Sequence, residues 1–388
     1  MKVPSAKAQH LPADLIRPKD HAIVLAMSNY PFLSSAFLNS LENSNSVGPD
    51  TGWQPAHIEQ CYAAGNSAFM PTYVKTHSWG EYVFDWAWAD AYQRNGLDYY
   101  PKLVSAIPFS PATGPRVVFS GEGDRQQACQ GLFQQARELA DEEQAHSWHL
   151  LFPDTQTLGW FEHPDLMLRT GVQYHWLNRG YESFEHFLST FASRKRKMVK
   201  RERRRVGEQG LEIEVLPGSA IDTELWQFFY QLYQSTYRKR SGNNGYLSPR
   251  FFLQLGESMA DNIAMAVARK DGQPIACALY FHGGDTLYGR YWGCAEEYDY
   301  LHFELCYYQG IEYAIAQGLQ RFDAGAQGEH KIVRGFEPVE THSLHWIRHP
   351  GFASAIGEFL DRETPEIKRY IEQAKSGLPY KEGAFSSS

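Results

Sequence analysis

Strand-like and helix-like segments alternate along almost the whole of this 388-residue chain. Residues 262–268 and 275–281 are short apolar runs on either side of Asp271-Gly272, a dipeptide typical of β-hairpin turns. Residues 126–143 and 301–317 have the longer apolar spacing of amphipathic helices. This mixture predicts a fold of the α/β or α+β class.

The length of the chain predicts two domains, because it is about 2.5 times the ~150 residues typical of one domain. A weak similarity in the order of elements between residues 65–99 and 272–318 suggests that one α/β unit is duplicated. The break Asn178-Arg179-Gly180 marks the predicted boundary. We expect a loose N-terminal arm over residues 1–17, a first domain over 18–180 and a second domain over 181–388, which opens with a helix over 181–205.

Several common functional signatures are absent from the sequence. It contains no GxxxxGK[ST] loop, no GxGxxG after a strand, no GxSxG turn and no HExxH pair, which disfavours kinases, dinucleotide enzymes and serine hydrolases. No stretch approaches the ~20 continuous apolar residues that cross a bilayer, and the N-terminus has no apolar signal core. We therefore expect a cytoplasmic protein without a transmembrane segment, whose five widely spaced cysteines are reduced thiols.

A concentration of positive charge stands out in the helix predicted over residues 181–205. Residues 194–205 hold nine Lys or Arg against Glu202, a local charge of +8, whereas the whole chain carries −8 and the remainder therefore −16. On a helix of about 100° per residue, the face opposite the Phe184, Leu188 and Phe191 stripe forms a positive ridge that predicts anion binding. The alternative is a solvated helix paired with the acidic remainder. The ridge contains Arg196, Lys197, Lys200, Arg203 and Arg204.

A second candidate site follows the strand predicted over residues 321–324. The strand end delivers Asp323 into a loop in which Gly325 and Gly328 allow a ligand to approach the backbone. The alternative is an ordinary helix N-terminus with ion pairs. Polar side chains that could contact a ligand follow at once: Gln327, Glu329, His330, Lys331 and Arg334.

These segments resemble the FemAB-like, GNAT-related N-acyltransferases. The resemblance rests on residues 183–197, 287–293 and 322–338, and the ending Lys331 to Pro338 is similar to the Lys-x-Gly-Phe-Gly close of peptidoglycan aminoacyltransferases. It implies two tandem GNAT-like domains, each a mixed central sheet flanked by helices, with a cleft between the halves. It also implies transfer of an acyl or aminoacyl group to an amine acceptor on a cell-envelope precursor, peptide or other small molecule.

The donor stays open between acyl-CoA and aminoacyl-tRNA. The acetyl-CoA pyrophosphate signature [RQ]xxGx[GA] has no match between Tyr291 and Leu301, where the acidic segment 294–299 stands instead. An acidic loop is a poor cradle for pyrophosphate. We therefore expect tRNA to be a possible partner, and no tightly bound cofactor.

Amine acylation needs a proton acceptor for the amine, a donor for the carbonyl oxygen and a proton for the leaving group. Glu304, Asp323 and His330 are candidates to take the amine proton, and Tyr291, Tyr307 or Tyr308 to protonate the leaving group. Glu304 and His302 could equally be structural. The candidates to hold phosphate or carboxylate are Arg290, Gln327, Lys331 and Arg334, together with the ridge.

Two further patterns have structural and functional interpretations. If residues 340–347 form a strand, His342 and His345 point to opposite faces, so we expect no metal site. The aromatic-rich passage 77–88 is interpreted as packing, with a role in an acceptor cleft as the alternative. The alternative function for the whole chain is a noncatalytic protein that binds RNA or an anionic envelope precursor on a GNAT-like scaffold.

Overall fold

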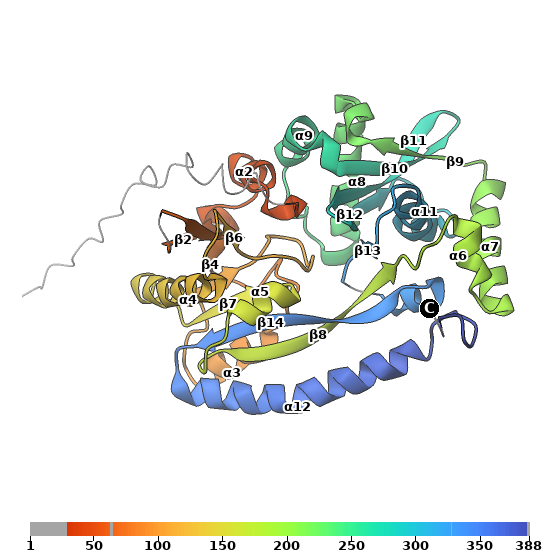
Figure 1. The fold of residues 1–388 in the computed structure, drawn as a ribbon. Coiled ribbons are helices and arrows are strands. Elements are labelled where there is room, and N and C mark those ends of the chain that lie inside the picture. Colours follow the sequence, from red (N-terminus) through yellow and green to blue (C-terminus); the bar gives the residue numbers. More distant parts are fainter. Residues whose placement is uncertain (1–28, 63–64, 327, 386–388) are drawn as a thin grey trace, which may run out of the picture.

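A computed structural model describes residues 29–62, 65–326 and 328–385. The predicted arm over residues 1–17 lies outside the described residues. One mixed sheet of eleven strands forms the centre of the molecule, and a small three-stranded sheet lies beside it (Figure 1). In spatial order the large sheet contains β1 (Trp53–Pro55), β4 (Thr72–Lys75), β5 (Lys102–Ser105), β7 (Ser147–Leu151), β14 (Glu337–Ile347), β8 (Met167–Leu177), β13 (Arg321–Asp323), β12 (Thr286–Cys294), β11 (Gln273–Gly283), β10 (Ile263–Lys270) and β9 (Glu212–Pro217).

Helices flank this sheet, as the predicted fold class requires. The hairpin predicted around Asp271-Gly272 is confirmed, since β10 and β11 pair antiparallel with Ile263 opposite Phe281. The helix predicted over 126–143 is also confirmed. The small sheet consists of β2 (Ile58–Cys61), β3 (Ser67–Met70) and β6 (Val118–Phe119). The α-helices are α2 (Ser35–Asn43), α3 (Trp86–Arg94), α4 (Arg125–Glu142), α5 (Thr155–Trp160), α6 (Phe184–Ser189), α7 (Ser193–Glu208), α8 (Thr223–Ser241), α9 (Pro249–Ser258), α10 (Leu301–Phe303), α11 (Gln309–Ala316) and α12 (Pro350–Lys375).

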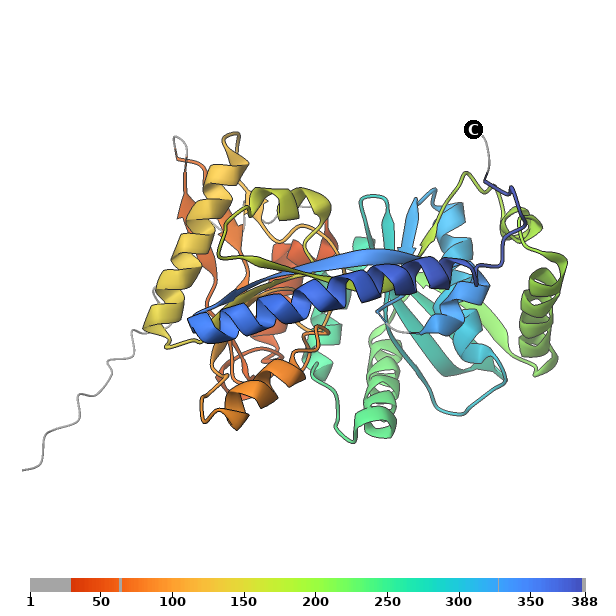
Figure 2. The ribbon, with the colours of Figure 1, turned by 90° about the horizontal axis from the view of Figure 1, so that it is seen from below.

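The two halves of the chain share the large sheet. Strand β8 pairs antiparallel with β13, with Leu177 opposite Arg321, and β14 pairs antiparallel with both β7 and β8. Helix α12 packs along β8 and β14 and runs beneath both halves (Figure 2). The sheet is therefore continuous across residue 180, and the division into two domains at that residue stays a prediction.

The single helix predicted over residues 181–205 is wrong, because α6 ends at Ser189 and α7 begins at Ser193. The backbone N–H of Ala192 donates to the carbonyl oxygen of Pro379 at 2.8 Å, so a segment distant in sequence takes the hydrogen bond that a continuous helix would make. The predicted apolar stripe is nevertheless buried, with Phe187, Leu188 and Phe191 packed in the core.

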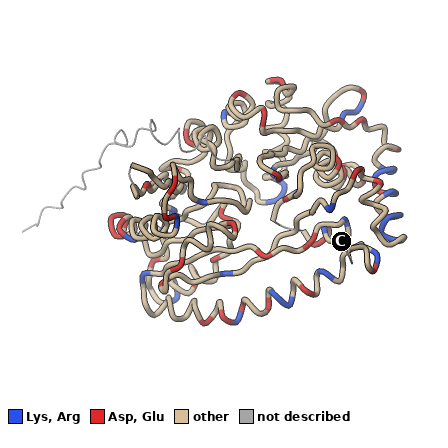
Figure 3. The backbone as a smooth tube through the Cα atoms, viewed as in Figure 1, with Lys and Arg blue, Asp and Glu red and all other residues tan. Residues whose placement is uncertain are grey.

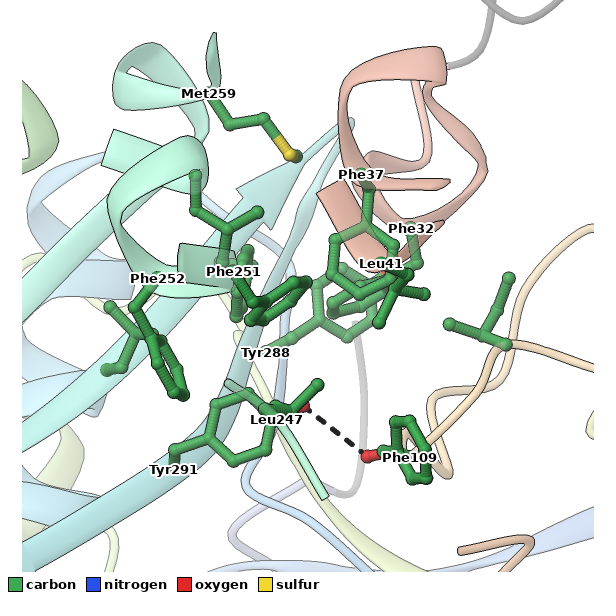
Figure 4. Packing of buried hydrophobic residues seen from close by; sticks show 14 of the residues in the cluster. Phe32, Phe37, Leu41, Phe109, Leu247, Phe251, Phe252, Met259, Tyr288 and Tyr291 are labelled. Atoms are coloured by element: carbon green, nitrogen blue, oxygen red, sulfur yellow. Dashed lines mark hydrogen bonds between the residues drawn. The ribbon is translucent and has the colours of Figure 1, made fainter. Parts of the chain in front are cut away.

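An aromatic core joins the halves on one side of the sheet (Figure 4). Phe37 of α2 packs edge-to-face against Phe251 of α9, with ring centroids 5.7 Å apart. Phe109, in a loop of the first half, stacks on Tyr246 of the second half at 4.9 Å. Burying an aromatic side chain of this size stabilises a fold by about 2–3 kcal/mol, so this core holds the loops of the two halves in fixed relative positions.

Candidate active site

A cavity of about 740 Å³ lies between the two halves of the chain. This volume is within the range of small-molecule sites. The first half contributes the loop 78–86, which connects β4 to α3, and part of the loop 109–111. The second half contributes the C-terminal end of α8, the middle of β11 and β12, the helix that begins at Leu301, and the loop 324–331. The cavity is thus built from both parts of the chain.

The charge of the cavity wall is opposite to that of the whole protein. The lining residues include the cations Arg240, Arg290 and Lys331, and among the described residues that line it there is no Asp or Glu. The chain carries −8 overall. Arg290 has an acidic partner behind the wall, Asp323, but the cavity surface itself presents cations, and such a surface attracts anionic groups and stabilises developing negative charge.

Lys331 is the most deeply buried cation of this wall. It lies on the 3-10 turn η7 (Glu329–Arg334), has 1% of its surface exposed and donates from Nζ to the carbonyl oxygen of Gly325. Burial lowers the pKa of Lys331 to about 8, although the negative charge of Asp323 opposes this shift. The ammonium group therefore stays protonated near neutral pH but is close to losing its proton, and Lys331 belongs to the wall that a substrate in the cavity would contact.

Two histidines and a tyrosine lie beside Lys331. The hydroxyl of Tyr307 is 2.8 Å from Nε2 of His330, and the ring of His302 packs edge-to-face on Tyr307 at 5.4 Å. Burial, reinforced by the positive charge of Arg334, lowers the pKa of His330, and burial together with Arg240 lowers the pKa of His302 to about 3. Both imidazoles are therefore neutral near pH 7, and a neutral imidazole can accept a proton.

The predicted helix over 301–317 contains a π-helical turn, η6 (Glu304–Tyr308), between α10 and α11. Such turns occur frequently at functional sites. Here Cys306 and Tyr307 line the cavity, whereas Glu304 and Tyr308 contact side chains of α7 on the other side of the helix. The turn therefore separates residues that face the cavity from residues that form structural contacts.

Arg290 and Asp323 hold each other in the wall. The Nη2 atom of Arg290 is 2.6 Å from Oδ2 of Asp323, and Oδ1 of Asp323 accepts a hydrogen bond from the N–H of Gly325 at 2.9 Å. The guanidinium of Arg290 holds the pKa of Asp323 well below its usual range, against the effect of burial. Arg290 lines the cavity and Asp323 lies behind it. Asp323 is thus an anchor for the loop that carries Gly325.

The remaining sequence candidates divide between the cavity and the rear of its wall. Tyr291 lines the cavity, burial raises its pKa, and its hydroxyl is 3.5 Å from the carbonyl oxygen of Phe109. Gln327 lies outside the described residues. The other candidates, Glu304, Arg334 and the ridge residues Arg196, Lys197, Lys200, Arg203 and Arg204, do not line the cavity.

Glu304 and Arg334 are occupied by partners on α7. Arg203 donates from Nη2 to Glu304 at 2.9 Å and also pairs with Glu312 at 2.8 Å. Arg334 pairs with the buried carboxylate of Glu202 at 2.8 Å. Burial raises the pKa of Glu304, while the charge of Arg203 opposes this shift. These two ion pairs attach α7 to the helix and turn whose other sides face the cavity.

An aromatic rim, which we define as Trp79, Phe84 and Trp86, surrounds the mouth of the cavity on the first half. Their exposed fractions are 53%, 57% and 38%, and the indole rings of Trp79 and Trp86 are 5.0 Å apart. The passage 77–88 contained the signal for this rim, but packing was the preferred interpretation. Buried or half-buried cations hold the loop: Lys75 donates to the carbonyl oxygen of Trp79 at 3.3 Å and Arg169 to that of Phe84 at 2.9 Å.

Arg240, at the end of α8, is a cavity residue that the sequence interpretation missed. It is exposed and has no ion-pair partner among the residues that the structure describes. Its charge reaches the inner wall, since it lowers the pKa values of His302 and His330. The run Arg238-Lys239-Arg240 before the loop 241–245 was the available signal. The exposed guanidinium can bind a carboxylate or phosphate of a ligand.

One family model matches almost the whole of this chain. Residues 14–382 match the sequence model of a family described as FemAB-like, peptidoglycan biosynthesis/recognition. Among curated proteins, none matches this chain. Within the described ranges, no helix is long and apolar enough to cross a membrane.

Two solved structures show the same fold at low sequence identity, and a third is less similar. A crystal structure of FemX is 14% identical with a TM-score of 0.51, and the match covers 86% of this chain and 96% of that chain. A conserved protein of unknown function from Bacteroides thetaiotaomicron is 13% identical with a TM-score of 0.50, covering 86% and 98%. A tandem GNAT protein from the clavulanic acid biosynthesis pathway is more distant, with 10% identity, a TM-score of 0.41 and coverage of 80% and 88%.

Proposed function

This chain belongs to the FemAB-like family of peptidoglycan biosynthesis and recognition, and we propose that it is an N-acyltransferase that moves an aminoacyl or acyl group from an activated ester or thioester to an amine. The acceptor we propose is an amine on a peptidoglycan precursor. The observation that carries the proposal is the buried side chain of Lys331 in a cavity whose described lining residues include no Asp or Glu.

Lys331 suits the transition state of this reaction. When the acceptor nitrogen attacks the carbonyl carbon of the donor, the carbonyl oxygen becomes an oxyanion in the tetrahedral intermediate. A preorganised N–H donor in a site shielded from water stabilises such a charge more than it stabilises the neutral carbonyl, and losing one such donor typically costs ~100- to 1000-fold in rate. Lys331 is a buried donor of the cavity, and its lowered pKa also lets it pass a proton to the departing oxygen or sulfur.

The amine proton needs an acceptor, and His330 is placed to take it. Its imidazole is neutral near pH 7 and hydrogen-bonds to Tyr307, which fixes the orientation of the ring. The bond balance is then complete: the new C–N bond forms, the C–O or C–S bond of the donor breaks, one proton moves from nitrogen to His330, and one proton moves from Lys331 to the leaving group. Exchange with solvent returns the proton from His330 to Lys331.

Aminoacyl-tRNA is the donor that we favour over acyl-CoA. The turn between β12 and α10 carries the exposed acids Glu296 and Glu297 and the acid Asp299, where a pyrophosphate would need backbone N–H groups and no negative charge.

On the acceptor side, the aromatic rim offers flat apolar surfaces, and Arg240 offers a cation at the same mouth. Together they fit an acceptor that combines a ring or apolar group with an anionic group.

An acyl-transfer assay tests the proposal. Purified protein is supplied with aminoacyl-tRNA or acetyl-CoA as donor and a peptidoglycan precursor carrying a free amine as acceptor, and amide formation is followed by mass spectrometry. We expect turnover with aminoacyl-tRNA that falls at least 100-fold in Lys331→Met. The matched control is Lys368→Met, an exposed lysine on α12. Amide formation that is equally fast in Lys331→Met would contradict the assignment, and absence of transfer from both donors would contradict the function.

A further inference from the structure

The outward face of α7 is a strongly positive surface that the cavity does not use. Val199, Glu202 and Val206 are buried and define the inner side of the helix. At about 100° per residue, the opposite side is not the ridge expected from sequence, because Arg203 turns inward to Glu304 and Glu312. The exposed cations of the outer side include Lys200, which pairs with Glu185 at 2.7 Å. The other five, which we call the outer face, are Arg194, Lys197, Arg201, Arg204 and Arg205, with Glu208 as the acid at its end.

Most of this charge is not neutralised within the protein. Arg194, Lys197 and Arg201 have no ion-pair partner among the residues that the structure describes. Arg204 and Arg205 both contact Glu208, at 3.4 Å and 3.5 Å, and Arg205 also contacts Asp299 at 3.5 Å, all on the open surface. Exposed pairs of this kind contribute only about 0–1 kcal/mol, so a ligand can replace them at little cost. The outer face therefore offers five cations to a partner.

The position and spacing of the outer face fit an extended polyanion. Arg194, Lys197, Arg201 and Arg204 recur every three or four residues, so they form one row about 15 Å long. The row lies at one end of the molecule, where Figure 3 shows positive charge gathered along α7. Because the rest of the chain is acidic, with −16 against the +8 of residues 194–205, other surfaces of the protein repel the same partner.

The outer face suits nucleic acid better than a lipid bilayer. A helix that binds a membrane surface lays apolar side chains into the headgroup region. On α7 the apolar side chains are Met198, Val199 and Val206; the two valines are buried, and Met198 is half-buried and packs against the core of the protein. The outward side chains are Lys and Arg, four of them Arg, which binds phosphate groups through two hydrogen bonds at once.

The outer face is also mechanically connected to the cavity. Helix α7 contacts η6 and η7, which carry Tyr307 and Lys331. The ion pairs Arg203–Glu304 and Arg334–Glu202 fix α7 to these two elements. A large donor held on α7 would therefore lie one layer of structure away from the proposed reaction centre, whereas a small donor such as acyl-CoA would not need this face.

We infer that the outer face of α7 is the docking surface for the stem of an RNA, namely the stem of the aminoacyl-tRNA donor. The inference rests on the proposed function for the identity of the RNA. The contacts are made to phosphates and ribose of a double-stranded stem, and they are independent of its sequence, as is usual for duplex RNA. The 3′ end of the same molecule enters the cavity with its aminoacyl group.

Binding of a labelled tRNA without its amino acid tests the docking surface separately from catalysis. The variant Lys197→Glu/Arg201→Glu/Arg204→Glu reverses three cations of the outer face. The matched control, Arg362→Glu/Lys368→Glu/Arg369→Glu, reverses one lysine and two arginines that are exposed on α12. We expect the wild-type Kd to weaken at least 30-fold in the α7 variant and less than threefold in the α12 variant. The slope of log Kd against log salt should fall by about 2–3 in the α7 variant alone.

Each other outcome overturns the inference. The first is that the wild type does not bind tRNA, and the second is that both variants weaken tRNA binding equally. The third is that the wild type binds phosphatidylglycerol vesicles more tightly than tRNA, and that the α7 variant loses this vesicle binding. Circular dichroism checks that α7 folds, and if charge reversal disturbs it, the Lys197→Gln/Arg201→Gln/Arg204→Gln variant gives the same comparison with a smaller expected loss, about 10-fold. If tRNA binds through α7 but no amide forms in the transfer assay, the docking surface stands and the proposed function fails.

Discussion

Arg290 and Asp323 form an ion pair of 2.6 Å in which both side chains are almost completely buried. The pair links the neighbouring parallel strands β12 and β13, and Asp323 also holds the backbone N–H of Gly325. Gly325 in turn accepts the hydrogen bond from Lys331. The sequence suggested Asp323 as a proton acceptor and Arg290 as a ligand contact, whereas their geometry makes them the support on which the loop with Lys331 is built.

Asp323→Asn should destabilise the fold by about 3–5 kcal/mol, because it leaves the buried charge of Arg290 without a counter-ion. The pKa of Asp323 is held below its usual value of 3.8, so its stabilising contribution is present above pH 4 and is lost as the pH falls. The difference between wild type and variant, measured by urea unfolding, should therefore shrink below pH 4. The double variant Arg290→Met/Asp323→Leu should recover most of the loss, and a single-variant cost under about 1 kcal/mol would contradict the support role.

Lys331→Met should lose activity and gain stability. The folded protein lowers the pKa of Lys331 from 10.5 to about 8, so at pH 7 it keeps a charge that burial disfavours. Removing that charge should raise the free energy of unfolding by about 1–3 kcal/mol at pH 7. The gain should shrink as the pH rises from 8 to 10.5, since the wild type is progressively relieved of the same penalty. Urea unfolding at pH 7 and pH 10 measures both values.

The wild-type reaction should show the same group in its pH profile. If protonated Lys331 stabilises the oxyanion, kcat should decline above a pH near 8. Lys331→Arg keeps a cation with a much higher pKa, so any residual activity of that variant should not decline there. A profile that stays flat to pH 10 in the wild type would count against Lys331 as the donor.

Local patterns in the sequence predicted the elements that depend on local interactions. The hairpin of β10 and β11 and the helix α4 follow from turn chemistry and from apolar spacing. The break between α6 and α7 depends instead on Pro379, almost two hundred residues away, whose carbonyl binds Ala192. The sequence of residues 181–205 alone therefore does not predict the hydrogen bond between Ala192 and Pro379.

The location of a site side chain is hard to predict from sequence when it can either face solvent or pair with a carboxylate inside the protein. Lys331 was singled out as a ligand contact, and it lines the cavity. The ridge prediction assumed that charged side chains face solvent, but Glu304 and Glu312 draw Arg203 inward. For Trp79 and Trp86 the sequence favours packing over a place in an acceptor cleft, because aromatic residues usually pack in the core and sequence alone does not show that they are exposed at a cavity mouth.

Glu304→Gln should keep turnover within threefold of the wild type and reduce stability by about 1–2 kcal/mol. Its carboxylate accepts hydrogen bonds from Arg203 at 2.9 Å and Gln309 at 2.8 Å and does not line the cavity. Arg203 keeps Glu312 as a partner in the variant, which limits the loss. Steady-state kinetics and thermal unfolding measure the two effects. A loss of kcat above 100-fold in a folded variant would instead make Glu304 the proton acceptor.

The aromatic rim should act on acceptor binding and leave the chemical step unchanged. Trp86→Ala removes an apolar side chain that is 38% exposed at the cavity mouth. Covering this surface with a ligand removes it from water, which favours binding. We expect the KM for the acceptor to rise about tenfold, which corresponds to about 1.4 kcal/mol, with kcat within twofold. Leu168→Ala is the control, since Leu168 is 46% exposed and does not line the cavity. An unchanged KM for the acceptor with a raised KM for the donor would place the donor at the rim and reverse the assignment of the two sides of the cavity.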